Sequence, residues 1–468
     1  MINLTDREYK ESIDITKAKD YEDAKNMIDK ANLPLFFTLD MIKSYGPAVL
    51  NRNRSGMQKS VMVGGSERQV ISSQALNRVI REQMADAVFL RTKTGHLAVA
   101  DKIIDDAKEN NKNISDEQIN YAMFIAAMIM YQDDKATPKE TKSLDVGDSY
   151  NAFRSKTSDP YSARDIETFA GIVKKALEDQ DVIAETDKAI ESAKKAFEKA
   201  GKSKTVKLSI GEKTVKYVIE AKTYMKTRKI DIAQAFFGSF ATSVTCETVE
   251  SAVKKGIAYS ITPYQSAQND WTAVNTFFPK SDSLKPLMRD GADNINTSYI
   301  SANTFYEKAK VDMRCALLNM LRNADFNDKE ALRKDIEESA EYLAYYIWCF
   351  AFAVPSGGQH TAYTSSLPDA LAVRTARSPQ TDMALDNEFF TPVKPSEKAD
   401  TVKAGIERMK NGLENAPDGF YGIDENRKKF WCGPKEEVPE GFECFSIKHL
   451  KKLTEEIRED LCYALLND

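Results

Sequence analysis

The chain has 468 residues and a formal net charge of −5, from 66 Lys plus Arg against 71 Asp plus Glu. The length allows roughly three domains, or one domain that carries large insertions. A mildly acidic chain is not a bulk polycation, so a nucleic-acid site would have to be local. No uncharged apolar run approaches the roughly 20 residues that span a bilayer, and the first ten residues have no apolar signal core. We therefore expect a cytoplasmic protein that does not contact a membrane.

Residues suited to catalysis are scarce. The three histidines, His96, His360 and His449, stand in no metal-binding spacing, and the chain has no phosphate loop, dinucleotide fingerprint or nucleophile elbow. The six cysteines are scattered, as is typical of reduced cytosolic thiols. Cys432 and Cys444 near His449 lack the CxxC pair and the fourth ligand of a structural zinc site. We expect no metal, no cofactor and no catalysis.

The first 31 residues are charged and helix-prone, and we interpret them as an added N-terminal arm. The β-rich segment from Pro34 to Lys43 predicts the first strand, ended by a turn at Gly46-Pro47. A polar loop at 51–60 follows this strand.

Two short strands are expected next, at 61–63 and 69–71, on either side of a turn at Gly64-Gly65. Ser72-Ser73 is a good N-cap for a helix that starts near Gln74. The apolar residues of this helix recur at helical spacing and predict one buried stripe: Leu76, Val79, Ile80 and Met84.

Residues 85–229 are mostly helical and highly charged in pattern, with a hairpin expected within 205–219 that turns at Gly211. Residues 264–300 are polar and loop-like. Apolar helices are predicted at about 309–323 and 331–352, and a Gly-rich loop then leads to a strand at 370–374. This order of strands and helices predicts an α+β fold with a large helical insertion.

Residues 41–85 carry a local excess of positive charge, with two acidic residues and seven basic ones. The basic residues are Lys43, Arg52, Arg54, Lys59, Arg68, Arg78 and Arg81. Gln74, Arg78 and Arg81 lie on the helix face opposite the apolar stripe. The helix start at Ser72 offers free N–H groups and the positive end of the helix dipole, where phosphates bind. This mixture suits a sugar-phosphate backbone. The alternative is an ordinary capped surface helix with solvated arginines.

The same region resembles a known family. Leu50-Asn51-Arg52, Met57-Gln58-Lys59, Gly64-Gly65 and the stretch from Ile71 to Arg81 (ISSQALNRVIR) are similar to the signature of CasC, the backbone subunit of type I-E CRISPR Cascade. Two further stretches resemble this family in the same order. They are Ala241–Ser243 with Trp271–Val274, and Val354–Gln359 with Leu367–Asp369.

The resemblance implies a modified RNA-recognition-type, ferredoxin-like palm with helical fingers and a thumb. The implied boundaries are an arm at 1–31; palm segments at 32–85, 241–263 and 301–468, the last including a C-terminal extension; fingers at 86–240 with an extra insertion at about 138–225; and a thumb at 264–300. Members of the family line up head-to-tail along a CRISPR guide RNA (crRNA) within Cascade, together with its other subunits. They present the guide for pairing with target DNA.

Carried onto this chain, the resemblance also implies the residues that contact RNA. The guide backbone would be held by Arg52, Lys59, Ser72, Gln74, Asn77, Arg78 and Arg81, with Asn77 standing where the family usually has lysine. Phe240 and Trp271 match apolar residues that wedge beside a flipped-out nucleotide, although core packing is the alternative for both. A second contact loop would comprise Ser356, Gly357, Gln359 and His360.

Two other functions remain open at this point. Related RNA-recognition folds include endoribonucleases that process guide RNA, for which His360 would be the acid or base. A metal-dependent version would need a thumb carboxylate such as Asp270 or Asp293. The third interpretation is a helical assembly protein that binds no nucleic acid.

Overall fold

The computed structural model describes residues 10–84, 89–132, 139–156, 158–199, 205–239, 248–274, 280, 282–283, 292–355, 357, 363–378, 385–394, 400–415 and 428–467. Within these residues, the many helices and a mixed β-sheet confirm the predicted α+β class. None of the described helices combines the length and the apolar character needed to cross a membrane.

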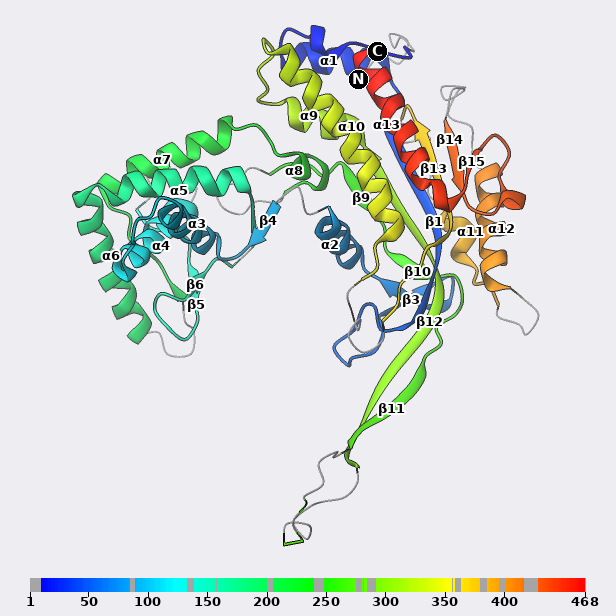
Figure 1. The fold of residues 1–468 in the computed structure, drawn as a ribbon, viewed down its shortest axis with the longest axis horizontal. Coiled ribbons are helices and arrows are strands. Elements are labelled where there is room, and N and C mark those ends of the chain that lie inside the picture. The colour runs from blue at the N-terminus through cyan, green and yellow to red at the C-terminus, as the bar shows by residue number, and fades with distance from the viewer. Residues whose placement is uncertain are drawn as a thin grey trace.

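A ten-stranded sheet forms the centre of the molecule (Figure 1). Its strand order is β15-β14-β13-β1-β12-β10-β3-β2, and β9 and β11 also pair with β12. The strands are β1 (Phe36–Ala48), β2 (Ser60–Val63), β3 (Ser66–Ile71), β9 (Val253–Lys255), β10 (Ala258–Ser260), β11 (Ala267–Val274), β12 (Ala292–Asp312), β13 (Pro368–Ala376), β14 (Lys429–Cys432) and β15 (Glu443–Phe445). β1 is central because it pairs antiparallel with both β12 and β13.

Side chains of β1 alternate between the two faces of the sheet, as strand geometry requires. Phe37, Leu39 and Met41 enter the main core beneath one layer of helices, whereas Ile42 enters a second core on the opposite face. The first layer comprises α1 (Tyr21–Ala31), α2 (Ser73–Gln83), α8 (Ile232–Phe237), α9 (Met313–Leu321), α10 (Lys329–Phe352) and α13 (Leu450–Leu466). The second comprises α11 (Asp386–Phe390) and α12 (Thr401–Glu414).

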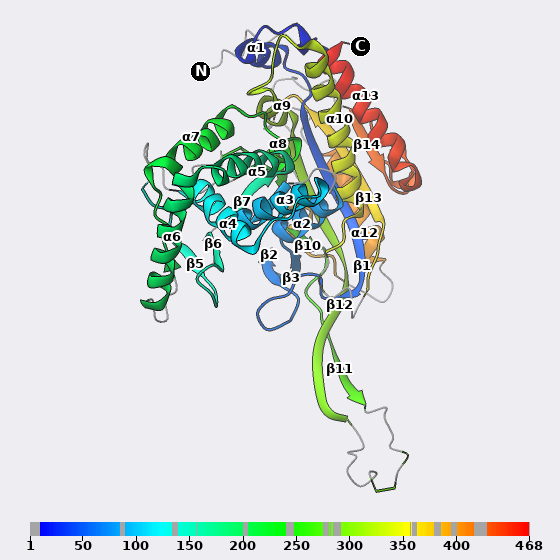
Figure 2. The ribbon, with the colours of Figure 1, turned by 60° about the vertical axis from the view of Figure 1, so that its left-hand side comes forward.

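A separate helical lobe stands beside the sheet (Figure 2). It has its own hydrophobic core, to which its long helices contribute. Its helices are α3 (Gly95–Glu109), α4 (Asp116–Met130), α5 (Ala163–Leu177), α6 (Gln180–Lys199) and α7 (Glu212–Thr227). Its strands are β4 (Phe89–Thr92), β5 (Leu144–Val146), β6 (Phe153–Arg154), β7 (Asp159–Ser162) and β8 (Thr205–Val206).

The hairpin predicted within 205–219 is wrong. β8 pairs with β5, far away in sequence, and the chain then enters α7 directly after Gly211. The carboxylate of Glu185 accepts hydrogen bonds from the N–H groups of Lys213 and Thr214, which caps the first turn of α7. A contact with another helix therefore decides the structure of this segment.

The turn predicted at Gly46-Pro47 is also wrong, because β1 continues to Ala48. The pairing of β1 with β12 shifts register between Tyr45 and Ala48, and this irregularity accommodates Pro47, which has no N–H to donate. The N–H of Gly46 instead donates to Oγ1 of Thr364 at 2.8 Å.

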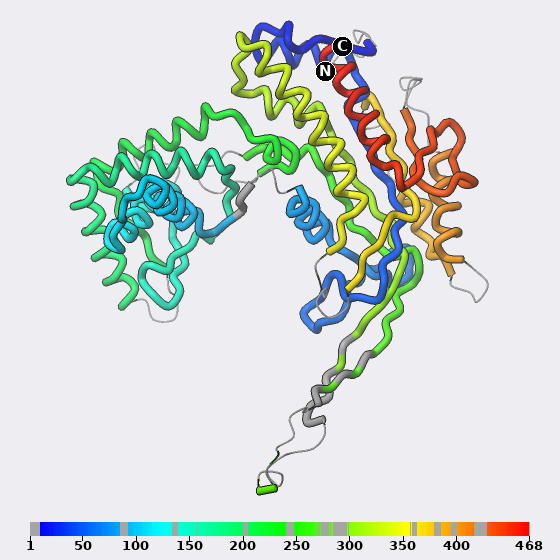
Figure 3. Tube along the Cα trace, in the orientation of Figure 1, coloured from blue at the N-terminus to red at the C-terminus, as the bar shows by residue number. Residues whose placement is uncertain are grey.

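Residues 264–300 are not simply a loop. β11 and the first half of β12 form a long antiparallel ribbon that projects from the sheet (Figure 3). β12 runs on to Asp312, so the helix predicted at 309–323 begins only at Met313. Asp312 caps that helix by accepting a hydrogen bond from the Cys315 N–H at 2.9 Å. The helix predicted at 331–352 and the strand at 370–374 are confirmed as α10 and β13.

Candidate nucleic-acid interface

The predicted interface starts at α2, whose form follows from its sequence. Ser72 caps the helix by accepting a hydrogen bond from the Ala75 N–H on its side-chain oxygen, at 3.3 Å. The predicted stripe is confirmed, since Leu76, Val79, Ile80 and Met84 are all buried. The N–H groups of Ser73 and Gln74, in the first turn, have no partner among the described residues and remain open to a ligand.

The opposite face of α2 presents the predicted polar residues unequally. Gln74 and Arg78 are exposed, and Arg78 forms a surface ion pair with Glu82 at 2.7 Å. Arg81 is half-buried and lies over the Phe237 ring, 5.9 Å from its centroid. Arg81 therefore joins α2 to α8, and its guanidinium has a structural role in addition to its charge.

Asn77, one turn before Arg81 on α2, is half-buried. Its side-chain oxygen is enclosed and has no hydrogen-bond partner among the described residues. The amide oxygen thus lies at the edge of the polar face with no described donor that fixes it.

The loop before β2 brings Arg52 and Lys59 next to the start of α2. Arg52 is exposed and Lys59 is half-buried. The connection runs through Asn51, whose side-chain oxygen accepts a hydrogen bond from the Ser72 N–H at 3.1 Å. Figure 1 shows this loop below α2 and beside β3.

Two of the seven basic residues in this region do not belong to the surface. Lys43 is fully buried and donates hydrogen bonds to the carbonyls of Ala351 and Ala353 at the end of α10, at 2.8 and 2.9 Å. Burial lowers the pKa of Lys43 to about 8. Arg68 is also fully buried and donates to the Ser260 carbonyl at 2.7 Å. The positive charge available to a ligand is therefore smaller than the sequence indicated.

The second predicted contact loop is described only at Gly357. A Cβ atom at this position would lie 2.4 Å from the Leu50 carbonyl oxygen and 2.8 Å from that of Val49. Only glycine permits this approach, because it has no Cβ, and the chain at Gly357 therefore packs against the residues that follow β1. Ser356, Gln359 and His360 lie outside the described residues.

The two predicted wedge residues are not tested by the structure. Phe240 lies outside the described residues. Trp271 lies within β11, where its backbone pairs with Asn296 of β12. It is therefore on the projecting ribbon, and the position of its side chain stays a prediction.

On the projecting ribbon, the structure describes the side-chain contacts of Asp270. Asp270 accepts hydrogen bonds from Gln268 at 3.0 Å and Thr297 at 2.7 Å, and both bonds lower the pKa of Asp270. Asp293 lies on the facing strand β12. The described part of the chain has no group of three His, Cys, Asp or Glu residues placed to hold a metal ion.

Sequence reasoning missed the polar side chains that organise this surface. Asn51 and Gln58 stand in the motif but were not predicted as site residues. Gln58 is 4% exposed and bonds to the backbone at Asn51 and Val70. A glutamine in a polar loop carries no sequence signal for burial, because glutamines in such loops are usually solvated.

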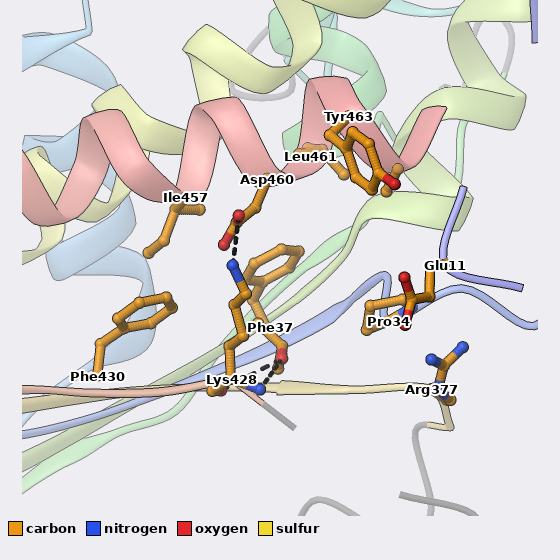
Figure 4. Close-up of a pocket in the computed structure, with 12 residues that line it drawn as sticks. Glu11, Pro34, Phe37, Arg377, Lys428, Phe430, Ile457, Asp460, Leu461 and Tyr463 are labelled. Carbon is orange, nitrogen blue, oxygen red and sulfur yellow. Dashed lines mark hydrogen bonds and ion pairs between the residues drawn. The ribbon is translucent and has the colours of Figure 1, made fainter. Parts of the chain in front are cut away.

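A cavity of about 320 Å³ lies elsewhere, between α13 and the strands β1, β13 and β14 (Figure 4). Phe37, Phe430 and Ile457 supply apolar walls, and Lys428 and Asp460 form an ion pair at 2.5 Å beside them. No predicted site residue lines this cavity. It is separate from the surface around α2.

The described elements define an α+β protein in which a mixed sheet carries two helical layers, a helical lobe and a projecting ribbon. The chain belongs to the family of CT1975-like Cas proteins, since the profile of that family matches residues 37–458. No curated protein sequence matches it.

Two solved structures share this fold. One is a chain of a "CRISPR RNA-guided surveillance complex, pre-nicking", with a TM-score of 0.60 at 17% identity, covering 90% of this chain and 100% of the other. The second is a chain of a "CRISPR RNA-guided surveillance complex", with a TM-score of 0.56 at 14% identity, covering 90% and 99%. At such identities the likeness concerns the fold.

Proposed function

We propose that this protein is a non-catalytic subunit that binds the backbone of a CRISPR guide RNA within a Cascade effector complex. Several copies would line up head-to-tail along the guide, beside other Cascade subunits, and present it for pairing with target DNA in antiviral defence. The observation that carries this proposal is the position of Arg52 and Lys59 beside the start of α2, where the N–H groups of Ser73 and Gln74 are open.

The chemistry of this surface suits phosphates rather than bases. Basic side chains and helix-start amides contact the sugar-phosphate backbone, and they carry no direct sequence information. Such contacts would let one protein hold any guide sequence. The family and the fold shared with chains of RNA-guided surveillance complexes support the same proposal.

The proposal includes the architecture implied by the resemblance. The antiparallel strands β13, β1, β12, β10 and β3 would form the RNA-recognition-type palm, the helical lobe the fingers, and the β11–β12 ribbon the thumb. The ribbon would extend toward a neighbouring copy on the guide, with Trp271 as a wedge beside a nucleotide.

Binding and cleavage assays with single-stranded RNA test the proposal. The protein should bind unrelated RNAs with similar affinity and should leave their length unchanged, with or without magnesium. Site-specific cleavage that His360→Ala abolishes would establish the endoribonuclease instead. Absence of RNA binding would favour the assembly protein that needs no nucleic acid.

A further inference from the structure

The loop at 51–59 is closed on itself by the side chain of Gln58. The Oε1 atom of Gln58 accepts a hydrogen bond from the Asn51 N–H at 3.1 Å, and Nε2 donates to the Val70 carbonyl at 2.7 Å. The side chain is only 4% exposed, so both bonds are shielded from water. One amide thus ties the first residue of the loop to its end and to β3.

The two basic residues of this loop lie directly beside that amide. Arg52 and Gln58 form an antiparallel bridge, and Lys59 is the next residue along the chain. The Lys59 N–H donates to the Asn51 carbonyl at 2.8 Å, and the Lys59 carbonyl accepts from the Val70 N–H at 2.9 Å. The backbone of both basic residues is therefore fixed, whereas the Arg52 side chain is exposed and that of Lys59 is half-buried.

The same short segment also supports the other two predicted contacts. Asn51 bonds to the Ser72 N–H at the start of α2, and Gly357 packs against the carbonyl of Leu50. Three separate parts of the candidate interface therefore meet at residues 49–51. The Gln58 side chain holds the Asn51 N–H and so contributes directly to fixing that segment.

We propose that Gln58 is a positioning residue that sets the spacing of Arg52 and Lys59 relative to α2 before RNA arrives. This inference rests on the proposed function. A loop that is already ordered loses little conformational freedom on binding, so more of the phosphate attraction appears as affinity. Gln58 contacts no phosphate itself, because its polar atoms are used by the backbone of Asn51 and Val70.

The chemical requirement at this position is specific. The site needs one acceptor and one donor on a flat group, which glutamine supplies and leucine does not. Gln58→Leu leaves the Asn51 N–H and the Val70 carbonyl without these partners at similar side-chain volume. Gln58→Asn keeps one acceptor and one donor on a side chain that is too short to reach both partners at once, so its effect should be intermediate.

Gln69 provides a matched control. It is a buried glutamine of β3 that is 1% exposed, and its Nε2 donates to the Gln265 carbonyl at 2.9 Å. Its side chain bonds to no residue of the 51–59 loop. Gln69→Leu therefore removes a buried amide from the same sheet and spares the loop.

The experiment measures the affinity of the full chain for a short single-stranded RNA across a range of salt concentrations. Gln58→Leu should bind about three- to tenfold more weakly, the effect of one or two lost hydrogen bonds. The slope of log affinity against log salt should stay at the wild-type value, because the same phosphates are contacted once RNA is bound. Lys59→Gln should instead lower that slope by about 0.7.

Hydrogen exchange at the Asn51 amide supplies a second readout that does not depend on RNA. Exchange should accelerate in Gln58→Leu and stay unchanged in Gln69→Leu. If Gln58→Leu does not fold, Gln58→Asn takes its place in both measurements.

Three results would overturn the positioning role: wild-type affinity in Gln58→Leu, a salt slope that falls as in Lys59→Gln, or an equal loss of affinity in Gln69→Leu. Failure of the proposed function is a distinct result. In that case the wild-type protein binds no RNA at all, whereas the Asn51 amide still reports whether Gln58 holds the loop.

Discussion

Lys255 and Glu307 form an ion pair that is closed off from water between the sheet and α10. The Nζ–Oε2 distance is 3.2 Å, and the two side chains are 0% and 2% exposed. Glu307 also accepts a hydrogen bond from the Tyr45 hydroxyl at 2.5 Å, and the Lys255 ammonium lies over the Phe350 ring. Burial lowers the pKa of Lys255, and burial beside Glu307 raises that of Tyr45.

Removing one member of this pair should be costly. Lys255→Met leaves a buried carboxylate without its partner, which typically lowers the free energy of unfolding by about 3–5 kcal/mol. Adding Glu307→Gln should recover a large part, since the amide oxygen still accepts from Tyr45. Urea denaturation of the single and double variants checks this. Equal stability of Lys255→Met and the wild type would show that the pair contributes nothing.

Stability of the helical lobe should fall in mild acid because of His96. This side chain is fully buried and stacked on Phe153, with ring centroids 4.6 Å apart. Burial lowers its pKa to about 4, against about 6.5 in the unfolded chain. The unfolded state binds the proton more readily, so stability is complete above pH 6.5 and declines as the pH falls toward 4.

The expected loss is up to about 3 kcal/mol. Helical content followed during denaturation at several pH values measures it. His96→Phe preserves the stacking and should flatten the pH dependence between 6.5 and 4. An unchanged pH profile in that variant would assign the acid sensitivity to other groups.

Reversing surface charge beside α2 should weaken RNA binding without regard to sequence. Replacing Arg52 and Lys59 by Glu should reduce affinity similarly for unrelated RNAs, and each lost phosphate contact should lower the salt slope by about 0.7. Arg68→Met is the contrasting variant, because Arg68 is buried against the Ser260 carbonyl. It should lower thermal stability and leave the slope unchanged. Loss of binding for one RNA sequence only would mean that these residues read bases.

A methyl group at Gly357 should disrupt the close contact of this residue with the Leu50 carbonyl oxygen. Gly357→Ala places a Cβ 2.4 Å from the Leu50 oxygen, so the backbone must move, at a cost of about 1–3 kcal/mol. Gly171→Ala is the matched control, because its Cβ meets nothing within 4 Å inside α5. The control should raise stability by about 0.5–1 kcal/mol. Thermal melts of both variants test this prediction. A Gly357→Ala variant that is more stable than the wild type would contradict the close contact between Gly357 and the Leu50 carbonyl.

Replacing Trp271 distinguishes a side chain that wedges beside a nucleotide from one that packs in the protein core. On the projecting ribbon, Trp271→Ala should leave the melting temperature of the free protein nearly unchanged and cost about 1–3 kcal/mol of RNA affinity. Calorimetry of the protein alone and RNA titrations provide the two numbers. A stability loss of about 3–5 kcal/mol with unchanged affinity would place the indole in a protein core.

Sequence patterns correctly predicted those elements whose structure is determined by residues close together in the chain. Helical spacing of apolar residues predicted the buried stripe of α2 and the extent of α10. The glycine pair predicted the β2–β3 turn, where Gly64 and Gly65 both have positive φ. In these cases the information lies within a few residues, so the sequence is sufficient.

Long-range contacts explain what the patterns did not predict. β8 pairs with β5, some sixty residues earlier, and the β11–β12 ribbon pairs two polar segments with no hydrophobic alternation. Lys43 and Arg68 count as surface charge in the sequence, yet the fold buries both. The motif located the candidate interface, whereas its hydrogen-bonded support through Asn51 and Gln58 required the structure.

The most direct test of the proposed function measures the affinity of the purified protein for two unrelated single-stranded RNAs as salt is varied, with magnesium present. Similar affinities, a common negative salt slope and full-length RNA at the end are the expected result. A strong preference for one sequence, shortened RNA or no binding at low salt would contradict it.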